Sequence, residues 1–141
     1  MRILCLDIGE RRIGVAVSDE TGTLARGLAT VERNGREFEQ LVRLVKENLP
    51  EKIVYGLPVR LDGSLSAQTE KTLSFIEELK KFLKLPLVPW DERLTTREAE
   101  NILLQADLSR HKRKRLRDKL SAQIILQSYL EANRPPVSEE P

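Results

Sequence analysis

Three acidic residues directly follow apolar segments of the sequence, at places where their side chains could bind a divalent cation. Asp7 comes after the apolar run Ile3–Leu6, and Asp91 and Glu92 come after the apolar stretch 85–90. Burying a lone carboxylate costs several kcal/mol unless a cation compensates its charge. Each of these acids therefore needs either a bound metal ion or a basic side chain, which for Asp7 could be a neighbouring arginine of the sequence.

A fourth acid, Asp118, lies in a strongly basic part of the chain. Seven of the ten residues from 110 to 119 are Lys or Arg, and Asp118 is the only acid among them. It precedes Ala122, Ile125 and Tyr129 by four, seven and eleven residues, a spacing that places all four on one face of a helix. We expect Asp118 to face inward, where it could form a core salt bridge or complete a set of metal ligands.

The types of these candidate ligands favour a hard cation. The sequence contains one cysteine, Cys5, which we expect to be a buried thiol, and one histidine, His111, which we expect on the basic surface. Carboxylates without a Cys or His cluster suit Mg²⁺ or Mn²⁺ better than zinc. Magnesium ions held in this way can hydrolyse phosphodiester bonds. Whether Asp91 or Glu92 is the ligand stays open, because Asp91 could cap the next turn and Arg93 could pair with either acid.

Hydrophobic periodicity predicts five strands and four helices. The predicted strands cover residues 2–8, 12–18, 24–32, 52–57 and 85–90, with a hairpin at 9–11. The first predicted helix runs from Phe38 to Leu49 and is closed by Pro50. The second has a core face of Leu73, Ile76, Leu79 and Leu83, the third runs from Thr95 to Ala106, and the last from Ser109 to about Leu130.

This order, βββαβαβαα, predicts an α/β fold with a mixed five-stranded sheet flanked by helices. Connections through helices make the first, fourth and fifth strands parallel neighbours, with their carboxyl ends at one edge of the sheet. Asp7 and the 91–92 pair would then be separated by two strand spacings, about 10 Å of backbone. Acidic side chains reaching inward from both positions could share ions about 4 Å apart.

The distribution of basic residues predicts a nucleic-acid-binding surface. The net charge is only +2, but outside residues 110–119 the chain has 17 basic and 21 acidic residues. A cationic segment on a slightly acidic body is typical of a polyanion-binding surface, although a solvated helix face would have the same composition. The predicted backbone-binding residues of this segment are Arg110, Lys112, Arg113, Lys114, Arg115, Arg117 and Lys119, and loops at the sheet edge add Arg11, Arg12, Arg60 and Arg93.

The length and composition predict one domain and no membrane partner. The 141 residues are a usual length for a single domain, which we assign to residues 1–133. The tail 134–141, with three prolines and paired glutamates, is expected to be disordered. No apolar stretch approaches the roughly 20 residues that span a bilayer, so a cytoplasmic location is expected.

Four motifs, in this order along the chain to about residue 131, resemble the YqgF (RuvX) family. They are Leu6-Asp7-Ile8-Gly9 with Arg12–Asp19, Tyr55-Gly56-Leu57-Pro58 with Asp62-Gly63, Asp91–Thr96, and Asp118–Ala122 with Ile125–Leu130. Members of this family are assigned as pre-16S ribosomal RNA nucleases and are also described as Holliday junction resolvase-like.

The resemblance implies a ribonuclease H-like fold and a nuclease that processes the 5′ end of pre-16S ribosomal RNA. It also implies that Asp7, Glu92 and Asp118 are the catalytic, metal-binding triad, with Mg²⁺ or Mn²⁺ as cofactor. The expected partners are structured RNA, such as a ribosomal RNA precursor, or branched DNA. The oligomeric state, monomer or dimer, is left open.

The sequence differs from bacterial junction resolvases at two positions, which leaves alternative functions open. The fourth strand ends in Tyr55-Gly56-Leu57-Pro58 without an acid, so the fifth strand must supply that ligand, and Ser121 stands where those resolvases have a second helical aspartate. One alternative is a non-catalytic RNA-binding ribosome assembly factor, and another is a Holliday junction resolvase acting on DNA. A third is an actin-like ATP-binding protein, suggested by Asp-x-Gly at the end of the first strand, but that architecture needs two such domains.

Overall fold

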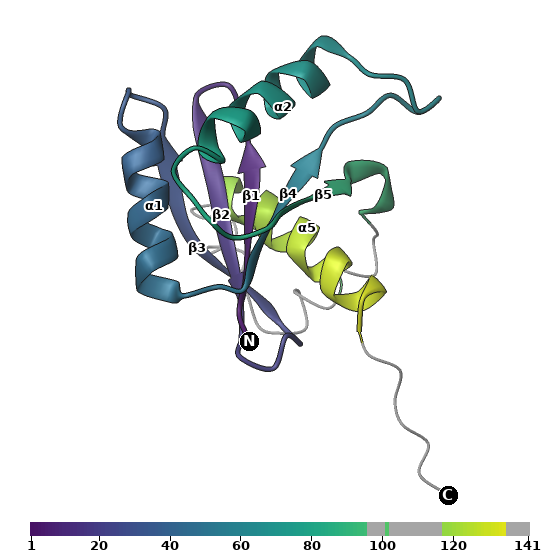
Figure 1. Cartoon of the computed structure of the whole chain (residues 1–141). Coiled ribbons are helices and arrows are strands. Elements are labelled where there is room, and N and C mark those ends of the chain that lie inside the picture. Colours follow the sequence, from purple (N-terminus) through teal and green to yellow (C-terminus); the bar gives the residue numbers. More distant parts are fainter. Residues whose placement is uncertain (96–100, 102–116, 135–141) are drawn as a thin grey trace, which may run out of the picture.

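The computed structural model describes residues 1–95, 101 and 117–134. It has an α/β fold in which a mixed five-stranded sheet carries helices on both faces (Figure 1). The strands are β1 (Ile3–Ile8), β2 (Arg12–Ser18), β3 (Ala25–Glu32), β4 (Lys52–Leu57) and β5 (Leu87–Asp91). The helices are α1 (Glu37–Asn48), α2 (Ala67–Leu79), the short 3-10 helix η1 (Glu92–Leu94) and α5 (Arg117–Ala132).

The order of the strands across the sheet is β3-β2-β1-β4-β5, which confirms the predicted neighbours. β1 pairs antiparallel with β2, and the hairpin between them is closed by the Gly9 N–H, which donates to the Arg12 carbonyl at 2.9 Å. β4 pairs in parallel with β1 on one side and with β5 on the other. The carboxyl ends of β1, β4 and β5 therefore lie at the same edge of the sheet.

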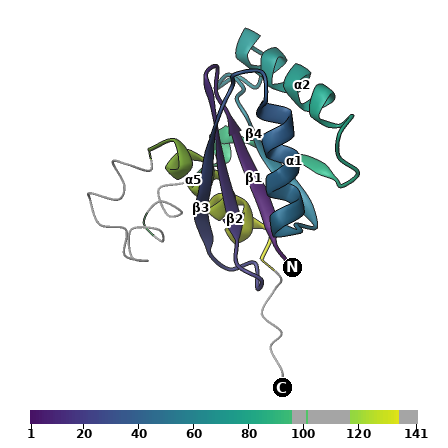
Figure 2. The same ribbon diagram turned by 90° about the vertical axis from the view of Figure 1, so that its left-hand side faces the viewer.

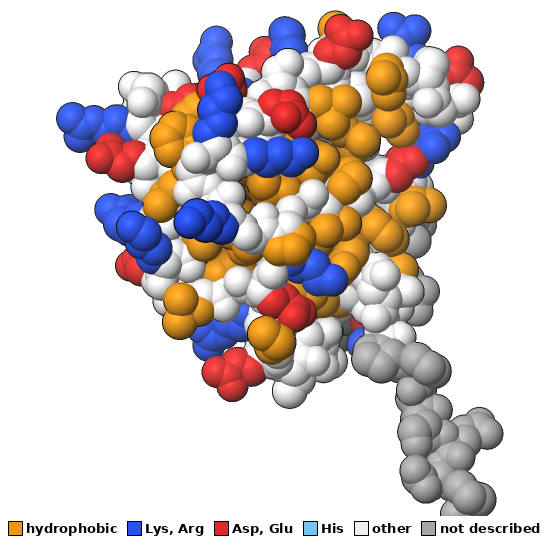
Figure 3. Space-filling view, viewed as in Figure 1, with side chains coloured by type: hydrophobic (Ala, Val, Ile, Leu, Met, Phe, Trp, Pro, Cys, Tyr) orange, Lys and Arg blue, Asp and Glu red, His pale blue; other side chains and the backbone are white. Residues whose placement is uncertain are grey.

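Successive residues of the strands point to opposite faces of the sheet, and this alternation divides the core in two. Leu4 and Leu6 belong to a cluster that includes residues of α1 and α2, whereas Ile3 and Cys5 belong to a cluster with residues of α5. Figure 2 shows this layering, with α1 and α2 on one side of the sheet and α5 on the other. Figure 3 looks onto the side of α1 and α2, where hydrophobic side chains gather among charged ones.

The end of α1 and the beginning of α2 are each fixed by local hydrogen bonds. The α1 helix ends at Asn48, and the next residue, Leu49, adopts a left-handed conformation (φ 47°) and donates its N–H to the Val45 carbonyl at 2.8 Å. At the start of α2, Ser66 and Thr69 form a capping box, which satisfies two backbone N–H groups. The Thr69 hydroxyl also hydrogen-bonds the carbonyl of Pro58, so the loop after β4 is tied to the beginning of α2.

The second helix is shorter than predicted, and this is a correction. Leu83 was placed on its core face, but α2 ends at Leu79. The Lys81 and Phe82 N–H groups bond the carbonyls three residues earlier, so the chain tightens into a turn instead of continuing as an α-helix. Phe82 then stacks on Phe38 of α1, with ring centroids 5.4 Å apart. Leu83 still packs against the core, but from the connection to β5.

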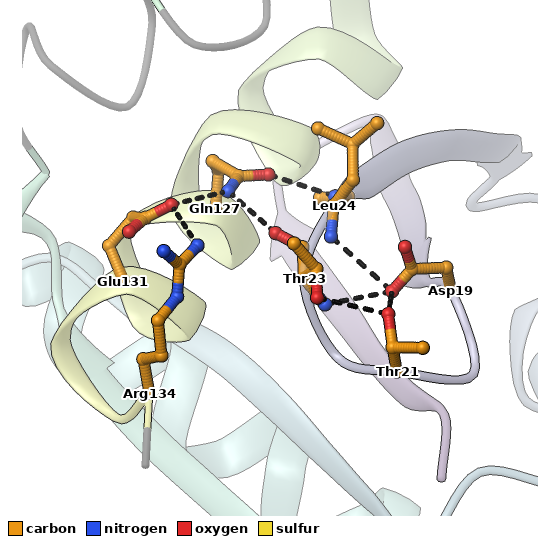
Figure 4. A network of polar contacts seen from close by, with 8 residues as sticks. Asp19, Thr21, Thr23, Leu24, Gln127, Glu131 and Arg134 are labelled. Atoms are coloured by element: carbon orange, nitrogen blue, oxygen red, sulfur yellow. Dashed lines mark hydrogen bonds and ion pairs between the residues drawn. The ribbon is translucent and has the colours of Figure 1, made fainter. Parts of the chain in front are cut away.

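Buried amides join α5 to the turn between β2 and β3 (Figure 4). The side-chain oxygen of Gln127 (Oε1) accepts the Ala25 N–H at 2.8 Å, and its side-chain nitrogen (Nε2) donates to the Thr23 carbonyl at 3.1 Å. Gln123, one turn earlier, donates to the Ala25 carbonyl at 3.1 Å. In the same turn the Asp19 carboxylate accepts the Thr23 N–H at 2.8 Å. These bonds fix the position of α5 across the sheet.

Several sequence predictions fall outside the described residues. Apart from Thr95 and Asn101, the helix predicted over 95–106 lies there, as does the predicted start of the last helix at Ser109. The same holds for the predicted disordered tail, of which only Arg134 is described. No helix in the described part of the chain is long and apolar enough to cross a membrane.

Candidate active site

Asp7 lies near the carboxyl end of the central strand β1, on the face that α5 covers. Ile3 and Cys5, two and four residues earlier, pack in the α5 cluster, and strand alternation continues this row to Asp7. Asp7 is half-buried and is opposite Gly14 of β2. The apolar strand β1 thus places the Asp7 carboxylate at the border between solvent and the hydrophobic cluster under α5.

Glu92 reaches the same place from the other side of β4. It is the first residue of η1, which begins where β5 ends. Its neighbour Asp91 has a different role, because the Asp91 carboxylate caps η1 by accepting the Arg93 N–H at 2.9 Å and pairs with the Arg93 guanidinium at 2.6 Å. Arg93 also donates to the Leu61 carbonyl at 3.2 Å, which links η1 to the loop after β4.

Asp7 and Glu92 line a common pocket at this edge of the sheet. The pocket has a volume of about 310 Å³ and is lined by Asp7, Glu92, Thr95, Ser121, Ile124 and Ile125. Two carboxylates from strands separated by β4 therefore open into one cavity, and α5 forms its other wall. This is the arrangement that the order of the strands predicted for a shared metal site.

The two adjacent carboxyl groups at the end of β5 differ in their electrostatics. Burial raises the pKa of Glu92, and the negative charges of Asp7 and Asp91 raise it further. Hydrogen bonds from Arg93 lower the pKa of Asp91 instead. The pKa of the Cys5 thiol is raised by its burial and then by the charges of Asp7 and Glu92. The negative field in the pocket would be relieved by a bound cation.

The third predicted acid, Asp118, belongs to the first described turn of α5. Its backbone lies one helical turn before Ser121, which lines the pocket. Its side chain is outside the described part of the structure. Among the described side chains, no group of three or more His, Cys, Asp or Glu residues could hold a metal ion. Among the described side chains the predicted triad is thus represented by Asp7 and Glu92, which line one pocket.

The predicted phosphate-binding arginines are placed around this edge in different ways. Arg11 and Arg12 are exposed at the turn between β1 and β2, and Arg60 is exposed in the loop after β4. Arg93 is engaged with Asp91. The side chains of the basic segment 110–119, His111 included, lie outside the described residues.

Two residues of the site were not among the predicted ligands. Thr95 lines the pocket, and its buried hydroxyl has no hydrogen-bond partner within the described structure. Gly56 lies on β4 beside the Glu92 carboxylate, so that a Cβ atom there would be 2.6 Å from Glu92 Oε1. The sequence signal for Gly56 is its place in an otherwise apolar strand, where a glycine often marks a close approach.

Two solved structures with a similar fold are resolvases in complex with Holliday junction DNA. RuvC of Thermus thermophilus, solved with a Holliday junction substrate, superposes with a TM-score of 0.61 at 15% identity, covering 94% of this chain and 95% of that one. The fowlpox virus resolvase, in complex with Holliday junction DNA, gives a TM-score of 0.53 at 14% identity, covering 96% and 100%. At such low identity these likenesses show the fold, which is ribonuclease H-like.

The sequence relationships are much closer and identify the family. A family model described as "RuvX: Holliday junction resolvase" matches residues 1–132. A protein of Thermoanaerobacter pseudethanolicus, named as a candidate pre-16S rRNA nuclease, is 45% identical over 137 residues, which cover 95% of this chain and 99% of that protein. A protein of the same name from Halothermothrix orenii is 48% identical over 132 residues, covering 92% and 94%. The chain belongs to the RuvX family, a nuclease family with the ribonuclease H-like fold.

Proposed function

We propose that the protein is a metal-dependent nuclease that hydrolyses phosphodiester bonds in structured RNA, with Asp7, Glu92 and Asp118 as its metal-binding carboxylates. The observation that carries this proposal is the shared pocket of Asp7, on β1, and Glu92, which directly follows β5 on the other side of β4. Burial, followed by the negative charge of Asp7, raises the pKa of Glu92, so this pair of carboxylates is electrostatically unfavourable without a cation.

The donor set of the pocket fits a hard divalent cation. Carboxylate oxygens are the ligands that Mg²⁺ and Mn²⁺ prefer, and Ser121 and Thr95 add hydroxyl oxygens to the wall. When bound, such a cation supplies a nucleophilic hydroxide and stabilises the charge on the leaving oxygen. Asp7 and Glu92 would hold it, and Asp118 of α5 would complete the set.

Several residues of the chain would orient the substrate around this centre. Arg11, Arg12 and Arg60 are exposed residues, and guanidinium groups are suited to bidentate contacts with phosphates. The basic segment 110–119 would bind the nucleic-acid backbone through its seven Lys and Arg residues. Tyr55 is buried and does not offer a stacking surface for a base. The arginines and the basic segment would thus recognise the phosphates of the substrate.

The names of the relatives indicate the substrate class. Proteins 45% to 48% identical to this chain over nearly their whole length are named for pre-16S ribosomal RNA, and we propose the 5′ end of that precursor as the cleavage site. Action on ribosomal RNA precursors implies a cytoplasmic location. Holliday junction DNA, bound by the structurally similar resolvases, is the alternative substrate.

A cleavage assay with a panel of substrates tests this proposal. The protein is incubated with precursor ribosomal RNA, a four-way DNA junction and single strands, each with Mg²⁺, with Mn²⁺ or with a chelator. We expect cleavage of the precursor RNA with the metals only, and a loss of at least about 100-fold in each of the Asp7→Asn, Glu92→Gln and Asp118→Asn variants. Cleavage of the junction alone would make the protein a DNA resolvase. RNA binding without cleavage would make it an assembly factor.

A further inference from the structure

The glycine of strand β4 is the clearest feature of the site that has no assigned role. β4 lies between the strands that bring Asp7 and Glu92 to the pocket. Leu6 of β1 is opposite Tyr55 of β4, so Asp7 and Gly56 are the next residues along these two parallel strands. Gly56 is in turn opposite Trp90 of β5. The glycine therefore lies between Asp7 of β1 and Trp90 of β5, two residues before Glu92.

The backbone of β4 does not explain why a glycine is present. Gly56 does not have a positive φ, whereas Gly22, Gly35 and Gly63 do. It lies within a regular parallel ladder and is buried. A glycine inside a strand weakens it by roughly 0.5–1 kcal/mol relative to alanine, so the position needs another reason.

The space beside Gly56 gives that reason. A Cβ atom there would lie 2.6 Å from Glu92 Oε1 and 3.3 Å from Glu92 Cγ, and 2.9 Å from Ile125 Cδ1 of α5. Distances below 3.0 Å are not found for real Cβ atoms, so at least one neighbour would have to move. The Ile125 side chain of α5 is buried in the core, whereas Glu92 is half-buried at the edge of the pocket. The carboxylate is therefore the group that an added methyl would displace.

We infer that Gly56 is a positioning residue, whose missing side chain leaves the space on β4 in which the Glu92 carboxylate lies beside Asp7. In this site β4 contributes space, and the carboxylate of Glu92, the first residue of η1, lies in it. A side chain at position 56 would displace the Glu92 carboxylate from this space and so change its placement relative to Asp7. The functional consequence rests on the proposed metal-dependent activity, but the placement of Glu92 does not.

The test compares Gly56→Ala with the unaltered protein in two measurements, Mn²⁺ affinity by calorimetric titration and the position of Glu92 in crystal structures. We expect Glu92 Oε1 to be displaced and Mn²⁺ to bind about 10- to 100-fold more weakly, the range found when groups that support a metal ligand are altered. In a Glu92→Ala background, Gly56→Ala should cause no further loss of Mn²⁺ affinity, because the effects of two substitutions that act through the same group do not add.

A second variant separates positioning from packing. Ile125→Val removes the Cδ1 atom, one of the two contacts below 3.0 Å, and leaves the contact with the carboxylate. In Gly56→Ala/Ile125→Val the melting temperature should recover toward that of Ile125→Val alone, while the Mn²⁺ affinity stays low. This double variant also keeps the test possible if Gly56→Ala alone folds poorly.

The outcomes distinguish this inference from the proposed function. If the unaltered protein binds no Mn²⁺, the proposed function fails, and the crystal structures still decide whether Gly56 positions Glu92. An unchanged Glu92 in the Gly56→Ala structure, or an affinity within about twofold of the unaltered protein, would overturn the inference. Recovery of the affinity by Ile125→Val would also overturn it, because the effect would then be one of packing.

Discussion

The Arg93 guanidinium lies 2.6 Å from the Asp91 carboxylate, and the Arg93 N–H donates to the same carboxylate at 2.9 Å. Asp91, the first of two consecutive acids, is thus engaged with Arg93. The second acid, Glu92, lines the pocket with Asp7. This local turn therefore favours Glu92 over Asp91 for the ligand role that we propose. A capped η1 directs one carboxylate outward and the other inward.

The first prediction separates the roles of these two acids. Glu92→Gln should weaken Mn²⁺ binding by about 100-fold, because it removes a ligand oxygen with its charge. Asp91→Asn should leave the affinity within about threefold, because Asp91 contacts Arg93 and not the pocket. Calorimetric titration with Mn²⁺ measures both. The opposite ranking would move the ligand role from Glu92 to Asp91.

The second prediction concerns stability and pH in the metal-free protein. The pKa of Glu92 is raised above its ordinary value of 4.5 by burial and by the charges of Asp7 and Asp91. The folded protein therefore holds this proton more tightly than the unfolded chain, so the free energy of unfolding should fall as the pH rises through the folded-state pKa. Glu92→Gln lacks this proton equilibrium and should be more stable than the unaltered protein at pH 7.

Urea unfolding with a chelator present, at a series of pH values, measures this effect. The stability difference between Glu92→Gln and the unaltered protein should shrink toward acidic pH, where Glu92 is protonated in both the folded and the unfolded state. A Glu92→Gln protein that is less stable at every pH would show instead that the carboxylate takes part in a structural salt bridge.

The third prediction tests the basic segment 110–119. If four to six phosphates are contacted, the logarithm of the RNA-binding constant should fall with the logarithm of salt concentration at a slope of about −3 to −5. Changing Arg113, Lys114 and Arg115 together to glutamine should flatten this slope and weaken binding to all substrates similarly. Fluorescence anisotropy over a range of salt concentrations measures both the binding constant and its slope. An unchanged slope would show that the segment is only a solvated surface.

The fourth prediction concerns the identity of the ion. Mg²⁺ and Mn²⁺ should support cleavage, whereas Ca²⁺ should bind the site but support little or none. Magnesium holds a near-octahedral shell at about 2.1 Å, but calcium accepts 6 to 8 ligands at about 2.3 to 2.6 Å and aligns water and phosphate less strictly. Cleavage rates and competition titrations with each ion measure this. Zinc-specific activity, or cleavage in excess chelator, would contradict the all-carboxylate site.

The sheet and the meeting of Asp7 with Glu92 could be predicted from the sequence because both depend on regular patterns. Apolar strands of period two joined by amphipathic helices fix which strands are parallel, and parallel strands bring their carboxyl ends to one edge. The end of α2 could not be predicted in this way, because Leu83 keeps the helical spacing although the chain turns after Leu79. The role of Gly56 was also hidden, because it depends on the position of a side chain from a neighbouring strand.

The most direct test of the central claim is a crystal structure of the protein soaked with Mn²⁺, with anomalous scattering measured to locate the metal. The account predicts an anomalous peak in the pocket, about 2.1 to 2.3 Å from carboxylate oxygens of Asp7, Glu92 and Asp118. The Asp7→Asn protein, treated in the same way, should lose the peak. A pocket without a peak in the unaltered protein, or a peak bound by other residues, would contradict the account.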